Sequence, residues 1–457
     1  MKGFLNQSQI AYVFYHLGHH IFLNDAIKES FAFVRQGQDI SAYSKRIIFP
    51  LSEKQFDPAG VIFCSGIPML FPVLSGPEQF ASINGNIIFN DDLLKSAFYL
   101  LTGYQEINPV NTDHFGRFEY ESSVQARLDI MARPVVNYYF NIIAKGISEF
   151  CRIHSIEFSR KNLFSSYAFL LTHDVDRVIY YNLNSLLNTI KQLAGFLKTG
   201  RKKSFLFKEI FRIGAHIINN PEGKDPYWNF SFLSELEKSL GIRSTWFFLP
   251  EDQKHIDSYY KLTDKKIQEL IGFLMNEGHE IGLHGTVRSH QSAEALMKIK
   301  NELVSVTGKE SQGIRQHRLM WKHPGTALIH EKTGFAYDAT LGFAGHEGFR
   351  NSYCHPFRLY DFENERMLNH WEIPLIVMES TLFDYRKLDF ISAQDTVDHL
   401  VNEIRTFNGV FTLLWHNNYF DEAERPGITA FYKNLLERIM SDRPEILTGK
   451  DIIKKLI

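Results

Sequence analysis

Two carboxylates at the end of an apolar run are the residues of this chain best placed to do chemistry. Asp174 and Asp176 lie in the stretch YAFLLTHDVDRV, residues 167–178. In an extended strand, residues two apart project to the same side, so the two carboxylates face one spot, whereas His173 and Val175 face the opposite side. Like charges held that close repel unless a cation lies between them or one takes a proton. The spacing therefore predicts a metal ion, an arginine partner or an acid–base role.

Further polar side chains follow apolar runs later in the chain. His284 ends GHEIGLHG, and the stretch RQHR places Arg315 and His317 on one face of a strand. Arg315 is expected either to neutralise and orient Asp174 or to form a structural salt bridge. His416 ends the apolar run GVFTLLWH. Packing of a buried strand gives no reason for a histidine at this position, so His416 is a candidate acid–base group.

One aspartate and two histidines facing a pocket form the ligand set of a catalytic zinc or a similar divalent ion. His284 is the first expected histidine, and either His317 or His290, which lies in the loop after His284, is the second. Such an ion keeps an open position for water and lowers the pKa of that water to about 7. The remaining aspartate would then act as the base.

The elements that must position these residues alternate strand and helix from about residue 165. Seven apolar runs are predicted as strands, namely YAFLLTHD, RSTWFFLP, HEIGLH, GIRQHRLMW, YDATLGF, WEIPLIVMES and GVFTLLWHNN. Intervening stretches such as DKKIQELIGFLMNEG repeat apolar residues at three and four positions, which is typical of amphipathic helices. The alternation predicts a parallel sheet or barrel, in which the strand ends and their polar residues gather at one edge. Glu379, Asp384 and Tyr385, at or after the sixth run, are expected either beside His416 or in a surface loop.

Two regions depart from this alternation. Residues 1–160 mix short strands and helices without a ligand cluster and are predicted to form an accessory α/β domain. The stretch NTDHFGRFEYE is expected to be a polar turn, with a catalytic role for Asp113 and His114 as the alternative. Residues 182–226 are predicted as a helical insertion in the main domain, 161–457. This insertion carries the basic residues Lys191, Lys198, Arg201, Lys202, Lys203, Lys208 and Arg212. A solvated helical hairpin is the simplest interpretation, and a peripheral membrane contact or a phosphate-bearing substrate is the alternative.

Composition excludes several classes of protein. The 457 residues carry a formal net charge of −2, which gives no overall field to attract nucleic acid. Three cysteines without a CxxC pair predict neither a disulfide framework nor a thiolate zinc site. Polar residues at positions 6–9 interrupt the stretch where a signal peptide needs its apolar core, and no run approaches 18 apolar residues. We therefore expect a cytoplasmic protein, of an oligomeric state that the sequence leaves open.

The order of THDVD, GHEIGLHG, GIRQHRLMW and FTLLWHNN resembles the polysaccharide deacetylase family, over roughly residues 165–450. The resemblance implies a deformed seven-stranded (β/α) barrel and a metal-dependent deacetylase. It implies that Asp174 is the catalytic base, that Arg315 braces this base, and that His416 protonates the leaving group. It also implies that Asp176 and His284 bind the metal ion. The N-terminal part, with DHFGRFEYESS, is similar to the accessory domain of some bacterial members from surface-polysaccharide contexts.

Two positions depart from the family pattern. The second metal histidine of the family lies four residues after the first, where this chain has Arg288, and the usual Arg-Pro strand motif is replaced by RQHR. The metal site is then completed by His317 or His290, weakened, or lost. We favour His317, because a strand end is a more rigid mount than a loop.

The resulting hypothesis is a metal-dependent hydrolase that removes acetyl from an N-acetylated sugar or glycan precursor, with one divalent ion, zinc or similar, as cofactor and carbohydrate as partner. Two alternatives remain. Arg288 favours a barrel that has lost its metal and binds carbohydrate or a partner protein, and the same chemistry would serve an O-acetyl esterase.

Overall fold

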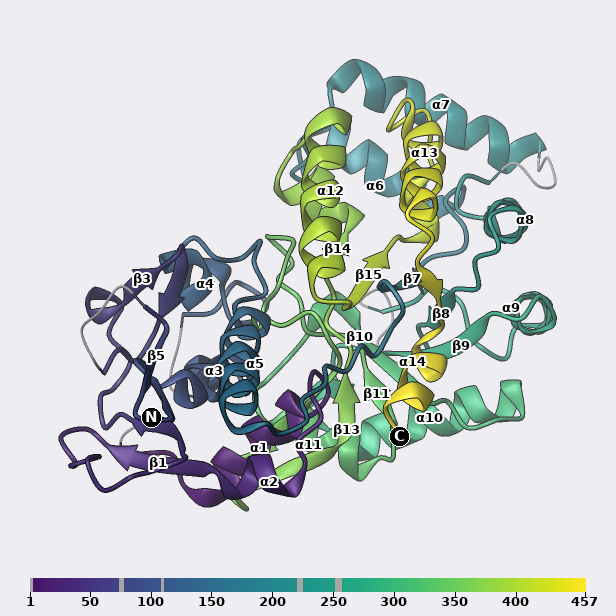
Figure 1. Ribbon diagram of the computed structural model, residues 1–457. Coiled ribbons are helices and arrows are strands. Elements are labelled where there is room, and N and C mark those ends of the chain that lie inside the picture. The colour runs from purple at the N-terminus through teal and green to yellow at the C-terminus, as the bar shows by residue number, and fades with distance from the viewer. Residues whose placement is uncertain (1–2, 74–77, 108–110, 220–224, 251–256) are drawn as a thin grey trace.

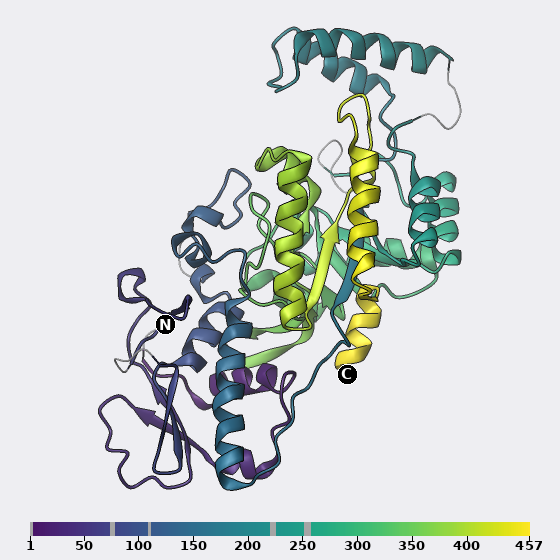
Figure 2. The ribbon, with the colours of Figure 1, turned by 45° about the horizontal axis from the view of Figure 1, so that its top comes forward.

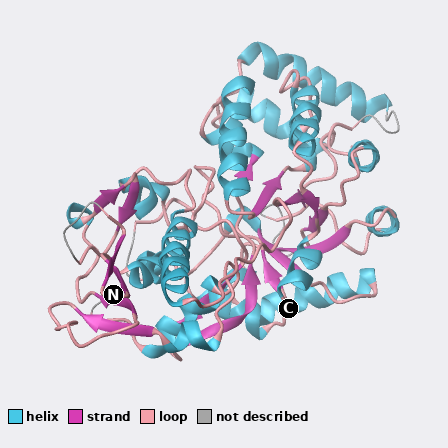
Figure 3. Ribbon diagram, in the orientation of Figure 1, coloured by secondary structure: helices cyan, strands magenta, loops and turns pink. Residues whose placement is uncertain are grey.

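The computed structural model describes residues 1–457 except 1–2, 74–77, 108–110, 220–224 and 251–256. It consists of an N-terminal α/β part packed beside a larger part in which helices surround a curled sheet (Figure 1). Figure 3 shows that the strands of the larger part converge on its centre, with the helices outside them. No helix in the described ranges is both long and apolar enough to cross a bilayer.

The N-terminal part is built on a small sheet with the strand order β1-β2-β6-β5. The strands of this sheet are β1 (Phe31–Arg35), β2 (Ile47–Leu51), β5 (Phe80–Ile83) and β6 (Asn86–Phe89). A separate pair is formed by β3 (Ile62–Cys64) and β4 (Ile67–Met69). The helices of the N-terminal part are α1 (Gln7–Leu17), α2 (Asp25–Glu29), α3 (Leu93–Leu101), α4 (Val124–Arg127) and α5 (Val135–His154). Helices α3 and α5 are apolar over much of their surface because they lie in the core of this part.

The larger part is built on a single sheet. Its strand order is β12-β13-β11-β10-β9-β8-β7-β15-β14, and β16 also pairs with β7. Its strands are β7 (Ala168–Val175), β8 (Thr245–Phe248), β9 (Glu280–Gly285), β10 (Gly313–Gln316), β11 (Tyr337–Asp338), β12 (Phe357–Asp361), β13 (Arg366–Glu372), β14 (Val377–Met378), β15 (Val410–Leu414) and β16 (Glu445–Ile446). All strands from β13 to β14 along this order run parallel, whereas β12 is antiparallel to β13.

The helices of the larger part are α6 (Leu183–Leu193), α7 (Lys203–Asn219), α8 (Phe230–Ser239), α9 (Lys265–Asn276), α10 (Ala293–Thr307), α11 (Gly325–Lys332), α12 (Phe390–Thr406), α13 (Ile428–Ser441) and α14 (Gly449–Leu456). Helices α8, α9, α10, α12 and α13 bury their apolar faces against the outer side of the sheet and form its main core. The predicted alternation of strands and helices is therefore confirmed.

The predicted count of seven strands is wrong, because the run WEIPLIVMES forms two strands instead of one. Trp371 and Glu372 end β13, and Val377 and Met378 form β14. Pro374, which has no N–H to donate to a ladder, lies in the break between them. The hairpin partner β12 and the short β16 were also not predicted.

This split shows how strongly the sheet curls. The strands β13 and β14 are seven steps apart in the sheet, which would be about 34 Å in a flat sheet. The link from Glu372 to Val377 spans at most about 18 Å. The two ends of the parallel array must therefore approach each other, although no ladder in the described part of the chain joins them. The fold is an α/β half-barrel that resembles the expected barrel without closing.

A glycine makes the close packing of this sheet possible. A Cβ on Gly313, the first residue of β10, would lie 2.1 Å from Cζ of the buried Tyr337 on β11. The ring of Tyr337 therefore fills the space on the face of the sheet that a side chain at position 313 would need.

We expect Gly313→Ala to lower the free energy of unfolding by about 1 to 3 kcal/mol, because the tyrosine ring must move in a packed interior. Urea unfolding followed by circular dichroism measures this change. Gly272→Ala is the matched control, since its Cβ would meet nothing within 4 Å on helix α9, where alanine is favoured over glycine by about 1 kcal/mol. Equal midpoints for the two variants would contradict this account of the packing.

Candidate metal centre and catalytic site

The candidate residues gather at the carboxyl edge of the curled sheet. Asp174 lies in β7 and Asp176 directly follows it, while His284 lies in β9. Arg315 lies in β10 and His317 follows it, and Arg315 is aligned with His284 in the ladder between β9 and β10. His416 follows β15, which pairs with β7. Because these strands are parallel, their carboxyl ends meet at the same edge.

Asp176, His284 and His317 form a cluster of the kind that holds a metal ion. Each offers one ligand atom, and the three atoms lie within 4.8 Å of one another. Nε2 of His284 is 3.3 Å from Oδ1 of Asp176, and Nε2 of His317 is 3.7 Å from Oδ2 of Asp176. Ligand atoms bonded tetrahedrally to zinc at about 2.1 Å stand about 3.4 Å apart. The spacing of the cluster therefore fits one divalent ion.

Two buried polar atoms of the cluster support this fit. Nε2 of His284 and Oδ1 of Asp176 are both buried, and neither forms a hydrogen bond with any residue that the structure describes. A buried polar group without a partner is costly, and in native proteins such a group is explained by an ion, a water or a functional role. These two atoms face each other at a distance that suits two ligands of one cation.

The outer nitrogen of each histidine holds its ring in the orientation that ligation requires. Nδ1 of His284 donates to the backbone carbonyl of Arg315 at 2.8 Å. Nδ1 of His317 lies 3.1 Å from Oδ1 of the buried Asp257. With the proton on Nδ1, the lone pair of Nε2 is left for a metal, which is the usual arrangement around ligating histidines.

Asp174 lies beside this cluster and is tied to Arg315. Nη1 of Arg315 donates to Oδ1 of Asp174 at 3.0 Å and to Oγ1 of Thr172 at 2.8 Å. Oδ2 of Asp174 is 3.5 Å from Nε2 of His284. The guanidinium of Arg315 bonds to Oδ1 and leaves Oδ2 without a bond to it. The arginine thus orients the carboxylate and leaves its second oxygen beside the cluster.

His416 completes the site from the neighbouring strand. Its Nδ1 is 2.5 Å from Oε1 of the buried Glu379, and its Nε2 lies 3.8 Å from Oδ2 of Asp176 and 4.0 Å from Oδ2 of Asp174. The Glu379 carboxylate therefore turns Nε2 of the imidazole toward the two aspartates. Of the residues expected near His416, Glu379 contacts it directly, whereas Asp384 pairs with Arg425.

Charges within the site shift the pKa values of its residues. Burial would lower the pKa of His416, but Glu379, together with Asp176 and Asp174, raises it to about 10. Burial would likewise lower the pKa of His284, but Asp174 and Asp176 raise it above its ordinary value. Burial would raise the pKa of Asp176, yet the His317 and His284 imidazoles hold it well below its usual range. The site is thus a compact group of opposite charges that stabilise one another.

His290, the alternative third ligand, forms its hydrogen bonds within its own loop. Nδ1 of His290 lies 2.7 Å from the backbone carbonyl of Val287, and its Nε2 lies 2.6 Å from Nε2 of Gln291. His290 therefore points away from Asp176 and His284, while His317 joins them. The two-residue spacing in RQHR accounts for the position of His317, because Gln316 between Arg315 and His317 faces the opposite side and accepts a hydrogen bond from Ser289.

The N-terminal part supplies a wall of the site that the sequence did not reveal. A cavity of about 230 Å³ beside the catalytic residues is lined by Phe115, Arg117, Arg318 and Tyr385. A second cavity of about 180 Å³ shares Arg117 and Tyr385 with it and extends along residues 117–121. The sequence predicted the turn around Phe115 as a polar turn or as a source of catalytic groups. Its mixture of aromatic and basic residues is the signal that could have indicated a binding role.

This wall is bonded to the segment that follows β10. The guanidinium of Arg117 is paired with Asp113 at 2.6 Å and donates to the backbone carbonyl of Arg318 at 2.6 Å. The guanidinium carbons of Arg117 and Arg318 each lie 5.0 Å from the ring centre of Phe115. Arg318 and Leu319 have φ values of +59° and +53°, a conformation that non-glycine residues adopt at a cost. These contacts fix the backbone immediately after His317.

Comparison with protein families gives a match in the N-terminal part. A family of unknown function, DUF7033, matches residues 5–151. Comparison with curated proteins finds no match.

Several solved structures are similar to about two thirds of this chain. Puue allantoinase is 16% identical, with a TM-score of 0.42 over 64% of this chain and 90% of that chain. A probable polysaccharide deacetylase from Pseudomonas aeruginosa PAO1 has the same identity, TM-score and coverage. A CE4 family pseudoenzyme from Bacillus anthracis is 10% identical, with a TM-score of 0.31 over 64% of this chain and 66% of that chain.

We expect His317→Ala to weaken zinc binding at least about 100-fold, because the cluster would lose one of three ligands. Equilibrium dialysis followed by elemental analysis measures the affinity. His290→Ala serves as the matched control and should bind zinc as the parent does. Loss of the ion in His290→Ala alone would show that the loop supplies the third ligand. A parent that binds no divalent ion would leave a metal-free binding protein as the better description.

Proposed function

We propose that the protein is a metal-dependent hydrolase that removes acetyl from the nitrogen of an acetylated sugar. The observation that carries this proposal is the position of Asp174 and His416. Both present a side-chain atom within 4.0 Å of the cluster formed by Asp176, His284 and His317, and each is held by a buried partner. A metal-type cluster flanked by one carboxylate and one imidazole is a suitable set for hydrolysing an acyl group.

Asp176, His284 and His317 would hold the ion. When bound there, a divalent ion polarises an acyl carbonyl and makes water more acidic. Asp174 accepts a proton from the water that attacks the carbonyl carbon, and Arg315 orients its carboxylate for this transfer. The C–N bond then breaks, and Nε2 of His416 donates a proton to the departing nitrogen. Glu379 stabilises the imidazolium and fixes the direction of Nε2.

The acid favours an amide over an ester as the bond that is cleaved. An amide nitrogen is a poor leaving group as an anion, so its departure requires protonation, whereas an alkoxide leaves more readily. His416 is oriented toward the cluster by its bond to Glu379, which suits such a donor. An O-acetyl esterase remains the alternative, and matched N-acetyl and O-acetyl substrates distinguish the two activities.

The substrate we propose is a carbohydrate of more than one sugar or a sugar with a bulky substituent. Two adjoining cavities meet at Arg117 and Tyr385, and Phe115 offers an aromatic ring beside the catalytic residues. Aromatic and basic side chains together bind the apolar faces and the hydroxyl or acidic groups of sugars. We also propose a cytoplasmic location and a glycan precursor as substrate, since the three cysteines are free and buried, as in proteins of a reducing compartment.

Asp174→Asn and His416→Ala are expected to retain zinc and fold but to lose about 10²- to 10⁴-fold in kcat, because each removes a positioned proton-transfer group. Acetate release from N-acetylglucosamine oligomers, assayed together with zinc content, measures both effects. Asp384→Asn is the control, since this carboxylate pairs with Arg425 away from the cluster. Near-parental turnover in either test variant would remove that residue from the mechanism.

A second expectation concerns the N-terminal wall. Phe115→Ala should raise KM for the oligomer about 3- to 10-fold with little change in kcat or zinc content, because the ring contacts bound sugar and not the reacting atoms. Phe33→Ala is the control, as this exposed ring lies on β1 in the small sheet. A fall in kcat with unchanged KM would indicate that the wall acts by holding the segment after His317 instead.

A further inference from the structure

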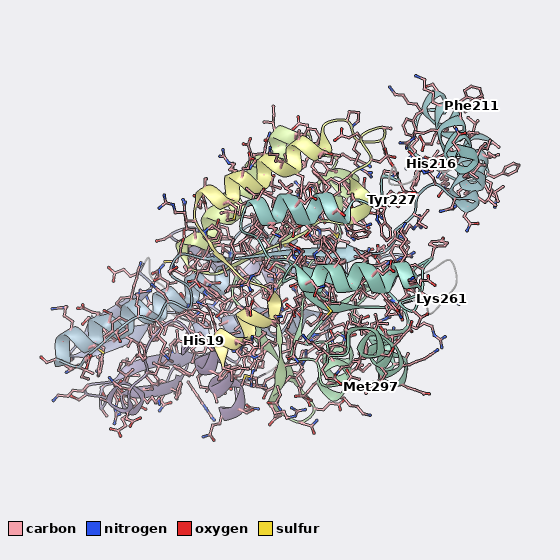
Figure 4. The ribbon with its side chains drawn as sticks, turned by 90° about the vertical axis from the view of Figure 1, so that its right-hand side faces the viewer. His19, Phe211, His216, Tyr227, Lys261 and Met297 are labelled. Atoms are coloured by element: carbon pink, nitrogen blue, oxygen red, sulfur yellow. The ribbon has the colours of Figure 1, made fainter. Side chains whose placement is uncertain are left out.

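Helices α6 and α7 form a hairpin that stands away from the rest of the molecule. The two helices, Leu183–Leu193 and Lys203–Asn219, pack on each other and project beyond the helices that surround the sheet (Figure 2). Figure 4 shows the same hairpin from the side, where Phe211 and His216 lie on it well apart from the body that carries Met297. We refer to residues 179–219 as the hairpin.

The hairpin exposes far more apolar surface than its size predicts. Of the 22 large apolar side chains that are exposed in the described part of the chain, nine lie between residues 179 and 218. Leu183 and Leu187 are one turn apart on α6, and Phe207 and Phe211 are one turn apart on α7, with their ring centres at 5.0 Å. Phe196, in the link between the helices, is 82% exposed. A concentrated apolar surface of this kind on a protein marks a site of association.

The hairpin is also strongly basic. Between residues 183 and 219 it has seven lysines and arginines but a single acidic residue, Glu209, whereas the whole chain has a net charge of −2. Glu209 is buried and paired with Arg212. The five lysines of the hairpin form no ion pair with any described residue. They are Lys191, Lys198, Lys202, Lys203 and Lys208. The partner of this surface must therefore accept both apolar side chains and positive charge.

The base of the hairpin is fixed to the edge of the sheet that carries the catalytic residues. Arg212 pairs with Asp421, and Arg201 pairs with Glu424 at 2.6 Å. Both acids lie in the segment that follows His416, and α6 begins seven residues after Asp176. The hairpin therefore rises from the same end of the half-barrel as the mouth of the site.

We propose that the hairpin docks on an anionic membrane surface, with its apolar side chains at the boundary between headgroups and acyl chains and its lysines beside lipid phosphates. Helices that combine exposed aromatic and aliphatic residues with lysines bind membranes in this way. A second copy of the chain is a poorer occupant, because it would bring two strongly positive hairpins together. A solvated hairpin does not account for nine exposed apolar side chains.

Docking in this orientation has a consequence for the substrate. The docking places the mouth of the site at the membrane. If the site has the proposed function, on which this step rests, the acetylated sugar is one carried on a lipid anchor. The hairpin then supplies no catalytic group and acts by bringing the site to its substrate.

Co-sedimentation of the full chain with vesicles tests the docking. The protein should bind vesicles of phosphatidylcholine with 30% phosphatidylglycerol at least about tenfold more tightly than pure phosphatidylcholine vesicles, and salt should weaken this binding. Phe207→Ser with Phe211→Ser, and separately Lys202→Glu with Lys203→Glu, should each reduce binding about tenfold or more. Ile391→Ser and Lys298→Glu, exposed residues on α12 and α10, are matched controls that should bind as the parent does.

Each outcome separates the docking from the proposed activity. Absence of binding by the parent, or equal binding by all variants, overturns the docking. A dimer in light scattering that Phe211→Ser abolishes would assign the surface to a second copy and overturn it too. Hydrolysis of a water-soluble N-acetyl sugar and zinc content should be unchanged in the hairpin variants. A parent that binds vesicles but hydrolyses no acetyl sugar leaves the docking intact and removes only the lipid-linked substrate.

Discussion

The buried ion pair between Arg315 and Asp174 is the interaction on which the site depends. A guanidinium stays charged in proteins, so a fully buried Arg315 must be compensated by a carboxylate and hydrogen-bond acceptors. Asp174 provides the carboxylate, and the carbonyl of Ala339 accepts from Nε at 2.8 Å. Removing one partner of such a buried pair typically costs about 3 to 5 kcal/mol, because the other charge is left uncompensated.

The same pair shows why the curl of the sheet is a functional requirement. The strands β7 and β10 are separated by β8 and β9, which in a flat sheet would place them about 14 Å apart. Arg315 nevertheless reaches Asp174, and its guanidinium carbon lies 4.7 Å from the ring centre of Phe247 on the strand beside β7. Only a curled sheet brings these strands within the length of one side chain. The curvature of the sheet that assembles the metal-type cluster thus also allows Arg315 to contact Asp174.

The two parts of the chain build the site together. The core of the N-terminal part includes Trp321, Tyr353 and Phe357 from the larger part, and Arg350 forms a buried ion pair with Glu106 at 2.7 Å. Arg117 then ties the turn around Phe115 to the backbone that follows His317. An apolar core and buried charge pairs across the boundary hold the binding wall in register with the cluster. The N-terminal part is therefore a structural neighbour of the site, which its lack of ligand residues does not suggest.

The sequence by itself determined which residues could do chemistry and which faces they share. The period of two in a strand places Asp174 with Asp176 and Arg315 with His317, and this needs no tertiary information. Apolar runs separated by helical stretches likewise determined an α/β sheet with the polar residues at one edge. These are local rules, and the structure places the residues as the rules require.

Only the tertiary structure decided which candidates meet. It joined His317 instead of His290 to the cluster, because β10 is paired with β9 while His290 turns into its own loop. It divided WEIPLIVMES between two strands that are seven steps apart in the order of the sheet, and it brought Glu379 to His416 and Phe115 to the mouth of the site. The physical reason is that packing and strand pairing join residues far apart in the chain, whereas propensity and periodicity act over a few residues.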